Sequence, residues 1–361
     1  MLIDDLSIRP SPDFGRFRKV LLREGEPDRM PFYELFFDKP IKDRILGKPC
    51  LFPMLLPMGN LGPMIENEIE LWYRLGFDYV EMSPAFILGG YFKPVNDTAD
   101  LSHGLRFWLD EAKGSGIGNR ADFEKYPWLN PELIDLGPME EFIGKLRDGM
   151  AFVPQCGGVT ENATWAMGYE SMATNLVEDP DLVAMVFDKV GAAVLRMVER
   201  MIALPNVGAF AMGDDMGHKT ATLLSPKLLR KLAFPWHKKI ADVCHKKGIP
   251  FILHSCGKID AVMDDLIELG IDAKHSFEDQ ILPVTEAKKR WGDRIAVLGG
   301  VDMDILSRGT PDDVRARTRE VLRQCMPGGG YALGSGNSVA NYIKPENYLA
   351  MLEVGWREGR Y

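Results

Sequence analysis

The sequence lacks any run of basic residues and any long uninterrupted apolar stretch. Its 43 Lys and Arg are outnumbered by 52 Asp and Glu, which leaves a formal net charge of −9. An acidic chain of this kind is not expected to bind nucleic acid or an anionic membrane surface. No apolar window approaches the roughly 18 residues of a membrane-spanning helix. The amino terminus does not show the basic and apolar segments of an export signal. We therefore expect a cytoplasmic protein.

Cysteine is scarce as well. The five cysteines are scattered at positions 50, 156, 244, 256 and 325 of a 361-residue chain, which excludes a disulfide framework of the kind that small secreted domains use. What the chain does have is apolar content: 46% of its residues are hydrophobic and 26% are charged. This composition is that of a globular protein with a sizeable core and not of a disordered chain.

Short apolar runs alternate with amphipathic helical patterns along the chain. Continuous apolar runs are typical of strands that are buried on both faces of a parallel sheet, and short connections between strand and helix indicate βαβ units. Eight such runs predict a single closed (β/α)8 TIM barrel that spans residues 1–361. The predicted strands are residues 31–35, 79–82, 151–155, 207–212, 250–254, 271–275, 294–298 and 331–333.

One helix has readable ends, and one segment interrupts the alternation. Ser225 and Pro226 supply an N-cap and a first-turn proline, and Gly248 supplies a stop, so a helix is predicted from Pro226 to about Lys247. Residues 86–136, which follow the second strand, form a long mixed segment rich in aromatic residues, Pro and Gly. We interpret this insertion as a lid over the barrel or as a hairpin that braces it.

Polar residues cluster where the predicted strands end. In a closed barrel the reacting groups lie just beyond the carboxyl ends of the strands, so a ring of polar positions there predicts a pocket for a small-molecule substrate. Cys156, Asp302, Ser335 and Asn337 are the substrate-binding candidates in this ring. The polar stretches are residues 155–158, 213–215, 254–257, 275–279, 299–302 and 334–338.

The clearest chemical signal is the pair His254 and Cys256. Residues i and i+2 of an extended segment project the same way, and imidazole nitrogen with thiolate sulfur is a donor set that Zn²⁺ prefers. Glu278 lies beyond the next helix, at the end of the adjacent predicted strand, and is expected to complete a three-ligand zinc site. The alternative is a hydrogen-bonded histidine beside a buried thiol.

Asp214 and Asp215 are the catalytic candidates. Consecutive residues of a strand point to opposite sides, so only one of the two carboxylates can face the pocket. Neighbouring carboxylates also repel each other, which can raise the pKa of one toward the range of a general acid. The alternative is that one caps the following segment while the other pairs with Lys219.

The second half of the chain resembles the uroporphyrinogen decarboxylase superfamily, which includes corrinoid-linked zinc methyltransferases. Gly168, Tyr169 and Glu170 also fit the family pattern, which adds Tyr169 and Glu170 to the substrate-binding candidates. The resemblance implies a (β/α)8 barrel independently of the apolar runs. The segments that carry it are Gly-Asp-Asp-Met-Gly at 213–217, Ser-Pro at 225–226, Phe-Pro-Trp at 234–236, His-Ser-Cys-Gly at 254–257, Leu-Gly-Ile-Asp at 269–272, Gly-Gly-Val-Asp at 299–302 and Pro-Glu-Asn at 345–347.

The resemblance also separates the branches of the superfamily. Decarboxylases carry arginines after the first strand, where this chain has Glu34 and Asp38, so charge complementarity to a tetrapyrrole with many carboxylates is lost. The essential aspartate of the decarboxylases falls at Ser83, and their strand-eight histidine at Ser335. The methyltransferases place a His-x-Cys pair and a later Cys on zinc. His254 and Cys256 match the pair, and the later Cys again falls at Ser335, with Cys156 as a further candidate ligand.

The leading hypothesis is therefore a zinc-dependent methyltransferase that moves a methyl group from a methylcorrinoid, or a related donor, to a thiol. A corrinoid protein would be the partner that carries the donor. The alternatives are a metal-independent decarboxylase acting on uroporphyrinogen or a smaller acid, and a non-catalytic binder of a corrinoid or tetrapyrrole. The sequence does not indicate an oligomeric state.

Overall fold

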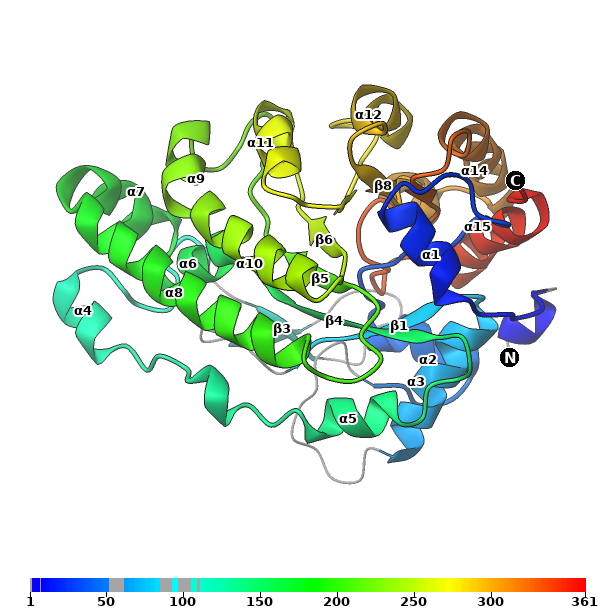
Figure 1. The fold of residues 1–361 in the computed structure, drawn as a ribbon, viewed down its shortest axis with the longest axis horizontal. Coiled ribbons are helices and arrows are strands. Elements are labelled where there is room, and N and C mark those ends of the chain that lie inside the picture. The colour runs from blue at the N-terminus through cyan, green and yellow to red at the C-terminus, as the bar shows by residue number, and fades with distance from the viewer. Residues whose placement is uncertain (1, 7, 52–61, 85–92, 97–104, 109–110) are drawn as a thin grey trace.

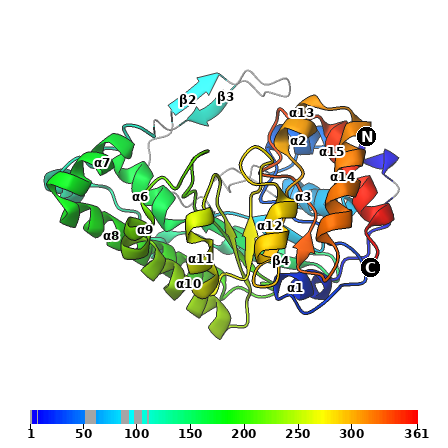
Figure 2. The same ribbon diagram turned by 90° about the horizontal axis from the view of Figure 1, so that it is seen from above.

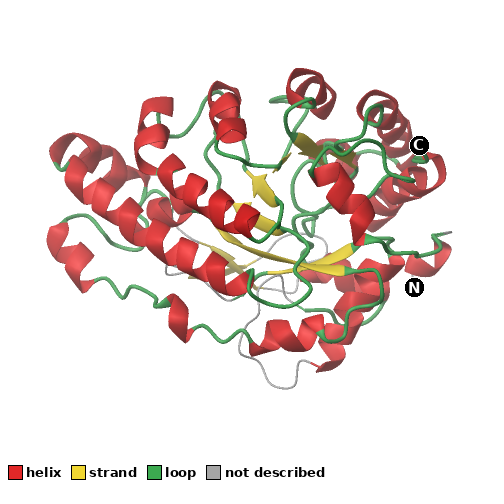
Figure 3. Cartoon of the chain, in the orientation of Figure 1, coloured by secondary structure: helices red, strands yellow, loops and turns green. Residues whose placement is uncertain are grey.

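The chain folds around one curled sheet of parallel strands with helices on its outside (Figure 1 and Figure 3). The structure is a computed structural model that describes residues 2–6, 8–51, 62–84, 93–96, 105–108 and 111–361. The sheet has seven strands in the order β1-β4-β5-β6-β7-β8-β9. They are β1 Tyr79–Met82, β4 Ala151–Gly157, β5 Phe210–Gly213, β6 Phe251–His254, β7 Ala273–His275, β8 Ala296–Leu298 and β9 Tyr331–Ala332.

These strands coincide with seven of the eight predicted apolar runs. Their side chains are almost all buried, as expected where a parallel sheet has its core on one face and helices on the other. The register aligns Gly157 with Gly213, Gly213 with His254, and His254 with His275. The carboxyl ends of four neighbouring strands therefore lie at one level, and this level holds the candidate site.

The first predicted strand, residues 31–35, joins the sheet only partly. It lies parallel to β9 through a bridge between Phe32 and Leu333, with the Tyr33 N–H donating to the Leu333 carbonyl at 2.8 Å. Toward β1 the contact runs through a side chain, because the Tyr79 hydroxyl accepts from the Glu34 N–H at 2.9 Å and donates to the Glu34 carbonyl at 2.8 Å. Among the described residues the hydrogen-bonded ladder thus has seven strands, and the eight-stranded barrel of the prediction is met in part.

Helices cover the outer face of the sheet, and both termini lie on the same side of the molecule (Figure 1). Within the described residues, no helix is long and apolar enough to cross a membrane. The α-helices are α1 Phe14–Leu21, α2 Lys39–Leu46, α3 Gly62–Arg74, α4 Arg120–Lys125, α5 Gly137–Ile143, α6 Val159–Met167, α7 Tyr169–Glu178, α8 Pro180–Met201, α9 Pro226–Leu232, α10 Phe234–Lys246, α11 Met263–Glu268, α12 Val284–Trp291, α13 Met303–Arg308, α14 Pro311–Cys325 and α15 Pro345–Glu358.

The single helix predicted from Pro226 to about Lys247 is in fact two helices. Helix α9 ends at Leu232 and α10 begins at Phe234, with Ala233 between them. The cause is Pro235, which has no N–H to donate and whose ring clashes with the preceding turn of a continuous helix. The predicted N-cap is present, since the Ser225 hydroxyl accepts from the Leu228 N–H at 3.3 Å.

The segment predicted as an insertion contains an antiparallel hairpin, β2 Lys93–Asn96 with β3 Leu105–Trp108. Figure 2 shows this hairpin at the periphery, apart from the seven-stranded sheet. Residues 86–92, 97–104 and 109–110 of the segment lie outside the described residues. Its role as a lid or as a brace stays a prediction.

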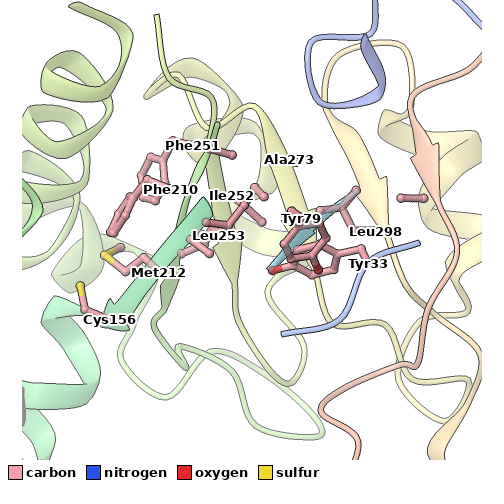
Figure 4. Packing of buried hydrophobic residues seen from close by; sticks show 14 of the residues in the cluster. Tyr33, Tyr79, Cys156, Phe210, Met212, Phe251, Ile252, Leu253, Ala273 and Leu298 are labelled. Atoms are coloured by element: carbon pink, nitrogen blue, oxygen red, sulfur yellow. The ribbon is translucent and has the colours of Figure 1, made fainter. Parts of the chain in front are cut away.

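The buried hydrophobic residues form one cluster that covers both faces of the sheet (Figure 4). Inside the curl, the rings of Tyr33 and Tyr79 stack at 6.0 Å between centroids. On the outer face, Phe210 and Met212 of β5 lie with Cys156 of β4. The division matters for the site, because side chains on the outer face cannot reach the mouth of the barrel.

Candidate metal centre

Three potential metal ligands meet at the carboxyl ends of β5 and β6. The ligand atoms of Asp215, His254 and Cys256 all lie within 4.8 Å of one another. We call these three residues the metal group. The His254 Nε2 atom is 3.3 Å from the Cys256 sulfur and 3.6 Å from Asp215 Oδ1. His254 and Cys256 were predicted as metal ligands from sequence, whereas Asp215 was predicted as a catalytic residue and not as a ligand.

The strand register explains why Asp215 takes this place. Gly213 of β5 lies opposite His254 of β6, so Asp215, two residues further on, lies opposite Cys256. Asp215 Oδ1 accepts the Cys256 backbone N–H at 2.7 Å, which fixes the two loops together. Asp215 therefore approaches the ion site from the neighbouring strand, as Glu278 was expected to do.

Glu278, the predicted third ligand, is not in this group. It lies three residues beyond the end of β7, and the chain turns before it: Ser276 adopts a φ of 97°, a left-handed conformation that a residue other than glycine rarely takes. Glu278 lines a small cavity with Lys274, Asp260 and Trp291 instead. The sequence indicated correctly that Glu278 follows the strand next to β6. It did not indicate the turn at Ser276, which directs the chain away from the three ligands.

A chain of hydrogen bonds determines which nitrogen of His254 carries the proton. The Ser335 carbonyl lies 3.2 Å from His275 Nε2, and because a carbonyl can only accept, His275 carries its proton on Nε2. In the neutral ring His275 Nδ1 is then an acceptor, and it lies 2.8 Å from His254 Nδ1. His254 therefore donates from Nδ1, which leaves the lone pair of Nε2 directed at Cys256 and Asp215.

Both histidines are neutral in this environment. Burial, with the nearby Lys274 charge, lowers the pKa of His254 to about 3, and burial together with His254 lowers the pKa of His275 well below its usual value. Only a neutral imidazole can bind a metal. The structure thus supplies the histidine in the protonation state and tautomer that metal binding requires.

The chain of hydrogen bonds requires a glycine at position 299. Its φ is 77°, and a Cβ at this position would lie 2.3 Å from the Ser335 carbonyl oxygen and 2.7 Å from His275 Nε2. Any side chain would therefore push these two atoms apart. The Gly299–Gly300 turn therefore lets the Ser335 carbonyl and His275 Nε2 come together.

The Cys256 sulfur also receives a hydrogen bond from Asn337, whose Nδ2 atom is 3.1 Å away. Burial and the Asp215 charge raise the pKa of the Cys256 thiol, while the Asn337 amide and the buried Lys274 oppose this. Burial lowers the pKa of Lys274 to about 8. A divalent cation at this point would reverse the preference of the thiol, because a coordinated thiol loses its proton.

Asp214, the other catalytic candidate, points away from this group. It is fully buried (0% exposed), with Oδ2 at 2.7 Å from His237 Nε2 of α10 and Oδ1 accepting the Glu161 N–H at 2.9 Å. It therefore joins the sheet to α10 and satisfies a backbone group in the first turn of α6. Lys219 is not its partner in these contacts.

Of the six substrate-binding candidates, only Asn337 contacts the metal group. Ser335 is turned away from it: its N–H and hydroxyl donate to Glu34 at 2.7 and 2.5 Å, and only its carbonyl takes part, through His275. The same contacts account for Glu34, which is buried against Ser335 and whose pKa is raised to about 8 by burial.

The other four candidates lie elsewhere. Cys156 is buried in the outer core. Both carboxylate oxygens of Asp302 accept hydrogen bonds, from the backbone N–H groups of Asp279 and Asp304. Tyr169 begins α7 half-buried, with its pKa raised to about 12 by burial and by Glu111, and Glu170 is exposed.

Three polar residues near the site were given no role from sequence. His275 lies in the predicted polar stretch 275–279, but only the structure shows that it is in register with His254. Glu81, in the apolar run 79–82, is a charged residue where none is expected, and it contacts Gln155. Glu161 gave no signal of its own. Its Oε2 atom lies 3.8 Å from where a Cβ of Gly157 would be, and burial together with Asp215 raises its pKa well above the usual value.

The donor set fits a zinc ion. Donors bound to one tetrahedral Zn²⁺ at about 2.0–2.3 Å lie roughly 3.3–3.8 Å apart, and the separations of 3.3 and 3.6 Å from His254 Nε2 fall in this range. Nitrogen, sulfur and oxygen donors are those that zinc accepts, and three protein ligands leave one position for a substrate. The outer support of His254 by His275 is of the kind that orients histidine ligands in metalloproteins.

Comparisons with known proteins place the chain in a family. A family model described as Uroporphyrinogen decarboxylase (URO-D) matches residues 103–355. The uroporphyrinogen decarboxylase of Anaeromyxobacter dehalogenans is 26% identical over 221 residues, which are 59% of this chain and 61% of that protein. The methylated-thiol–coenzyme M methyltransferase of Methanosarcina mazei is 27% identical over 193 residues, or 53% of this chain and 50% of that protein.

A third relative is the methylcobamide:CoM methyltransferase of Methanosarcina barkeri, 24% identical over 204 residues that cover 55% of this chain and 57% of that protein. The chain thus matches half to three-fifths of the length of these relatives. A solved structure, a methyltransferase from Methanosarcina mazei, superposes with a TM-score of 0.70 at 16% identity and covers 96% of this chain and 98% of that one. The last comparison supports the fold, and the family model covers more than half of the sequence: the chain belongs to the uroporphyrinogen decarboxylase family.

Proposed function

We propose that this protein is a zinc-dependent methyltransferase that transfers a methyl group from a methylcorrinoid, or a related donor, to a thiol acceptor. The observation that carries the proposal is the convergence of Asp215, His254 and Cys256, with the lone pair of His254 Nε2 directed at the other two ligands. Two of the relatives are methyltransferases by name, which agrees with this choice.

The residues of the chain have distinct tasks in the proposed reaction. His254, Cys256 and Asp215 would hold the metal. When bound, Zn²⁺ would lower the pKa of an acceptor thiol and so provide a thiolate at neutral pH. Asn337 donates to the Cys256 sulfur and keeps it in place. His275, through the Ser335 carbonyl, keeps His254 in the binding tautomer.

The transfer itself is a displacement at carbon. A carbon–sulfur bond forms as the bond between the methyl group and its donor breaks, and the electron pair of the broken bond stays with the donor. The thiol proton must leave the site first, and Asp215, whose side chain is about one-third exposed at 35%, is the carboxylate placed to pass it to solvent. A methylcorrinoid would be carried to the mouth by a partner protein.

Decarboxylation of a porphyrinogen is the competing function, because several relatives are uroporphyrinogen decarboxylases. Incubation of the purified protein with uroporphyrinogen, without added metal or thiol, distinguishes the two. Decarboxylated product would contradict our proposal. A tightly bound corrinoid or tetrapyrrole without turnover of either substrate would instead indicate the non-catalytic binder.

The direct test measures metal content and methyl transfer together. We expect close to one equivalent of zinc per chain and zinc-dependent methylation of a small thiol by methylcobalamin. His254→Ala and Cys256→Ala should lose both the zinc and the activity. Asp215→Asn should bind zinc more weakly, because a neutral amide replaces a carboxylate ligand.

The control for Cys256→Ala is Cys244→Ala, since Cys244 is a free cysteine too but is buried on α10, away from the metal ligands. The control should keep its zinc. Well-folded wild-type protein that takes up no zinc, or zinc-loaded protein whose activity survives both ligand substitutions, would remove the proposed function.

A further inference from the structure

A buried polar pair lies inside the curl of the sheet, below the metal group. Gln155 shares the inner face with Gly157, two residues further along β4, and Gly157 is aligned through Gly213 with His254. Glu81 of β1 lies opposite Val153 on the same face. Two residues of a strand span about 7 Å, so Gln155 lies one level below His254, while Glu81 starts one level lower and its side chain reaches Gln155. The two side chains are in contact at 2.5 Å.

Both side chains are more than nine-tenths buried, with Glu81 5% and Gln155 7% exposed. Their contact uses one polar atom from each. The other oxygen of Glu81 and the other amide atom of Gln155 have no hydrogen-bond partner among the described residues. Neither atom belongs to the fully buried polar atoms without a partner. These two atoms therefore face accessible space.

Open space lies one level above Gln155, beside the metal ligands. Gly213 is aligned with His254, and a Cβ placed on Gly213 would meet nothing within 4 Å. A glycine on an inner face, with open space in front of it, leaves room for a small molecule between the pair and His254. Glu161, over Gly157, lies beside the same space.

The hydrogen-bonding capacity of the pair follows from simple accounting. The Gln155 Nε2 atom donates to Glu81 Oε2. An acid proton on the second Glu81 oxygen makes that oxygen a donor, and the amide oxygen of Gln155 remains an acceptor. The neutral pair therefore offers one donor and one acceptor to the open space.

We propose that Glu81 and Gln155 bind the end of the acceptor that is remote from its sulfur, and that this end is an uncharged group with both a donor and an acceptor, namely a hydroxyl or a carboxamide. The acceptor is then a short neutral thiol that spans the two levels. This inference rests on the proposed function for the identity of the sulfur end, and on the geometry of the pair for the other end.

The surroundings of the pair agree with a neutral state. Burial, together with Glu68, raises the pKa of Glu81 well above its usual value, although Lys42 opposes this. Lys42 does not neutralise Glu81, because its ammonium group lies 2.8 Å from Glu68 in a buried ion pair. An anionic group brought next to Glu81 and Gln155 would be desolvated beside a pair that carries no compensating charge, and that is costly.

The first test concerns the pair alone and needs no metal. The infrared difference spectrum between wild type and Glu81→Gln, both metal-free at neutral pH, should show the carbonyl band of a protonated carboxylic acid in the wild type. Adding 2-mercaptoacetamide should shift this band, because a new hydrogen bond forms at the acid. Absence of the band, or a band that the thiol does not move, would overturn the proposal.

The second test measures selectivity on the cobalt-substituted protein, where a bound thiolate gives a charge-transfer absorption. We expect 2-mercaptoethanol and 2-mercaptoacetamide to bind about tenfold or more tightly than 2-mercaptoethanesulfonate and mercaptoacetate. Glu81→Leu and Gln155→Leu should abolish this preference. Gln324→Leu, a matched change at an exposed glutamine of α14, should retain it.

The outcomes separate the two proposals. Equal or tighter binding of the anionic thiols to wild type would overturn the inference about Glu81 and Gln155 and leave the proposed function standing. A protein that takes up no cobalt would contradict the proposed function, while the infrared test would still decide whether the pair is neutral and binds the uncharged thiol.

Discussion

Two histidine–carboxylate pairs lie near the end of β5, and they differ in what surrounds them. Asp214 pairs with His237 of α10; both are fully buried, and the aspartate oxygens are used by His237 and by a backbone group of α6. Asp215, one residue further along the chain, pairs with His254 of β6, whose Nε2 atom also meets the Cys256 sulfur. The same residue types therefore serve stability on one face of the sheet and ligand binding on the other.

The difference between the pairs lies in the second nitrogen of each ring. His237 Nδ1 is a buried atom without a partner, so nothing beyond Asp214 selects its tautomer. His254 Nδ1 is held by His275, which is held in turn by the Ser335 carbonyl. A histidine becomes a good metal ligand when its outer nitrogen is fixed, and only His254 meets this condition.

The largest effect should come from breaking the structural pair. Asp214→Ala removes the partner of a buried histidine and of the Glu161 N–H, so we expect the free energy of unfolding to fall by about 3–5 kcal/mol, with zinc stoichiometry of the folded protein unchanged. Urea unfolding and metal analysis measure the two quantities. Asp214→Asn, which keeps an acceptor for the Glu161 N–H, should lose less. Loss of zinc from folded Asp214→Ala would show that the two pairs are not independent.

The next effect concerns Glu34, at the end of the hydrogen-bond chain that runs from His254 through His275 and Ser335. Burial raises the pKa of Glu34 to about 8 in the folded protein, above its usual 4.5, so the folded state binds a proton that the unfolded state releases. This contribution to stability is complete below about pH 4.5 and is lost as the pH rises toward 8. We expect the free energy of unfolding, measured in urea, to decrease by roughly 3 kcal/mol between pH 5 and pH 8.

Glu34→Gln should reduce this pH dependence, because the amide can still accept from the Ser335 N–H but does not titrate. Glu81 and Glu161, whose pKa values are also raised by burial, should supply the slope that remains. A slope that Glu34→Gln leaves unchanged would assign the proton to another group.

A smaller effect should follow from removing the hydrogen bond between His254 and His275. His275→Phe keeps a buried ring but leaves His254 Nδ1 without its acceptor, so zinc affinity should fall by roughly 10- to 100-fold with the stoichiometry intact at high zinc. Competition with a chelator measures the affinity. A free choice of His254 tautomer, seen by nitrogen NMR of the metal-free variant, would accompany it. Unchanged affinity in a well-folded variant would contradict the hydrogen-bond chain.

The smallest effect should come from the residue that sequence reasoning placed in the site. Glu278→Gln should change zinc affinity by less than about twofold, because Glu278 lies outside the group of three ligands. Asp215→Asn in the same chelator competition supplies the contrast. If Glu278→Gln weakened zinc more than Asp215→Asn, the third ligand would be Glu278 after all.

Much of the fold could be read from the sequence because its signals are local. Seven of the eight predicted strands are present, since a continuous apolar run needs only its neighbours to be recognised. The run at 31–35 failed as a full strand because Tyr79, from the adjacent strand, uses its hydroxyl to bind the Glu34 backbone. The helix break at Ala233 was readable from Pro235 and was overlooked.

The site was less readable because it depends on register. His254 and Cys256 carry their own spacing, but Asp215 joins them only because Gly213 is aligned with His254, and the sequence does not state this alignment. Asn337 was predicted to bind the substrate, and in the structure its amide contacts the potential metal ligand Cys256. Glu81 and Gln155 are 74 residues apart, and only the folded sheet brings them together.

X-ray absorption at the zinc edge of the purified protein tests the central claim most directly. We predict one sulfur ligand at about 2.3 Å and nitrogen or oxygen ligands at about 2.0–2.2 Å, with the sulfur signal lost in Cys256→Ala and the histidine signal lost in His254→Ala. A spectrum with no sulfur ligand, or one that both substitutions leave unchanged, would contradict a zinc centre built by Asp215, His254 and Cys256.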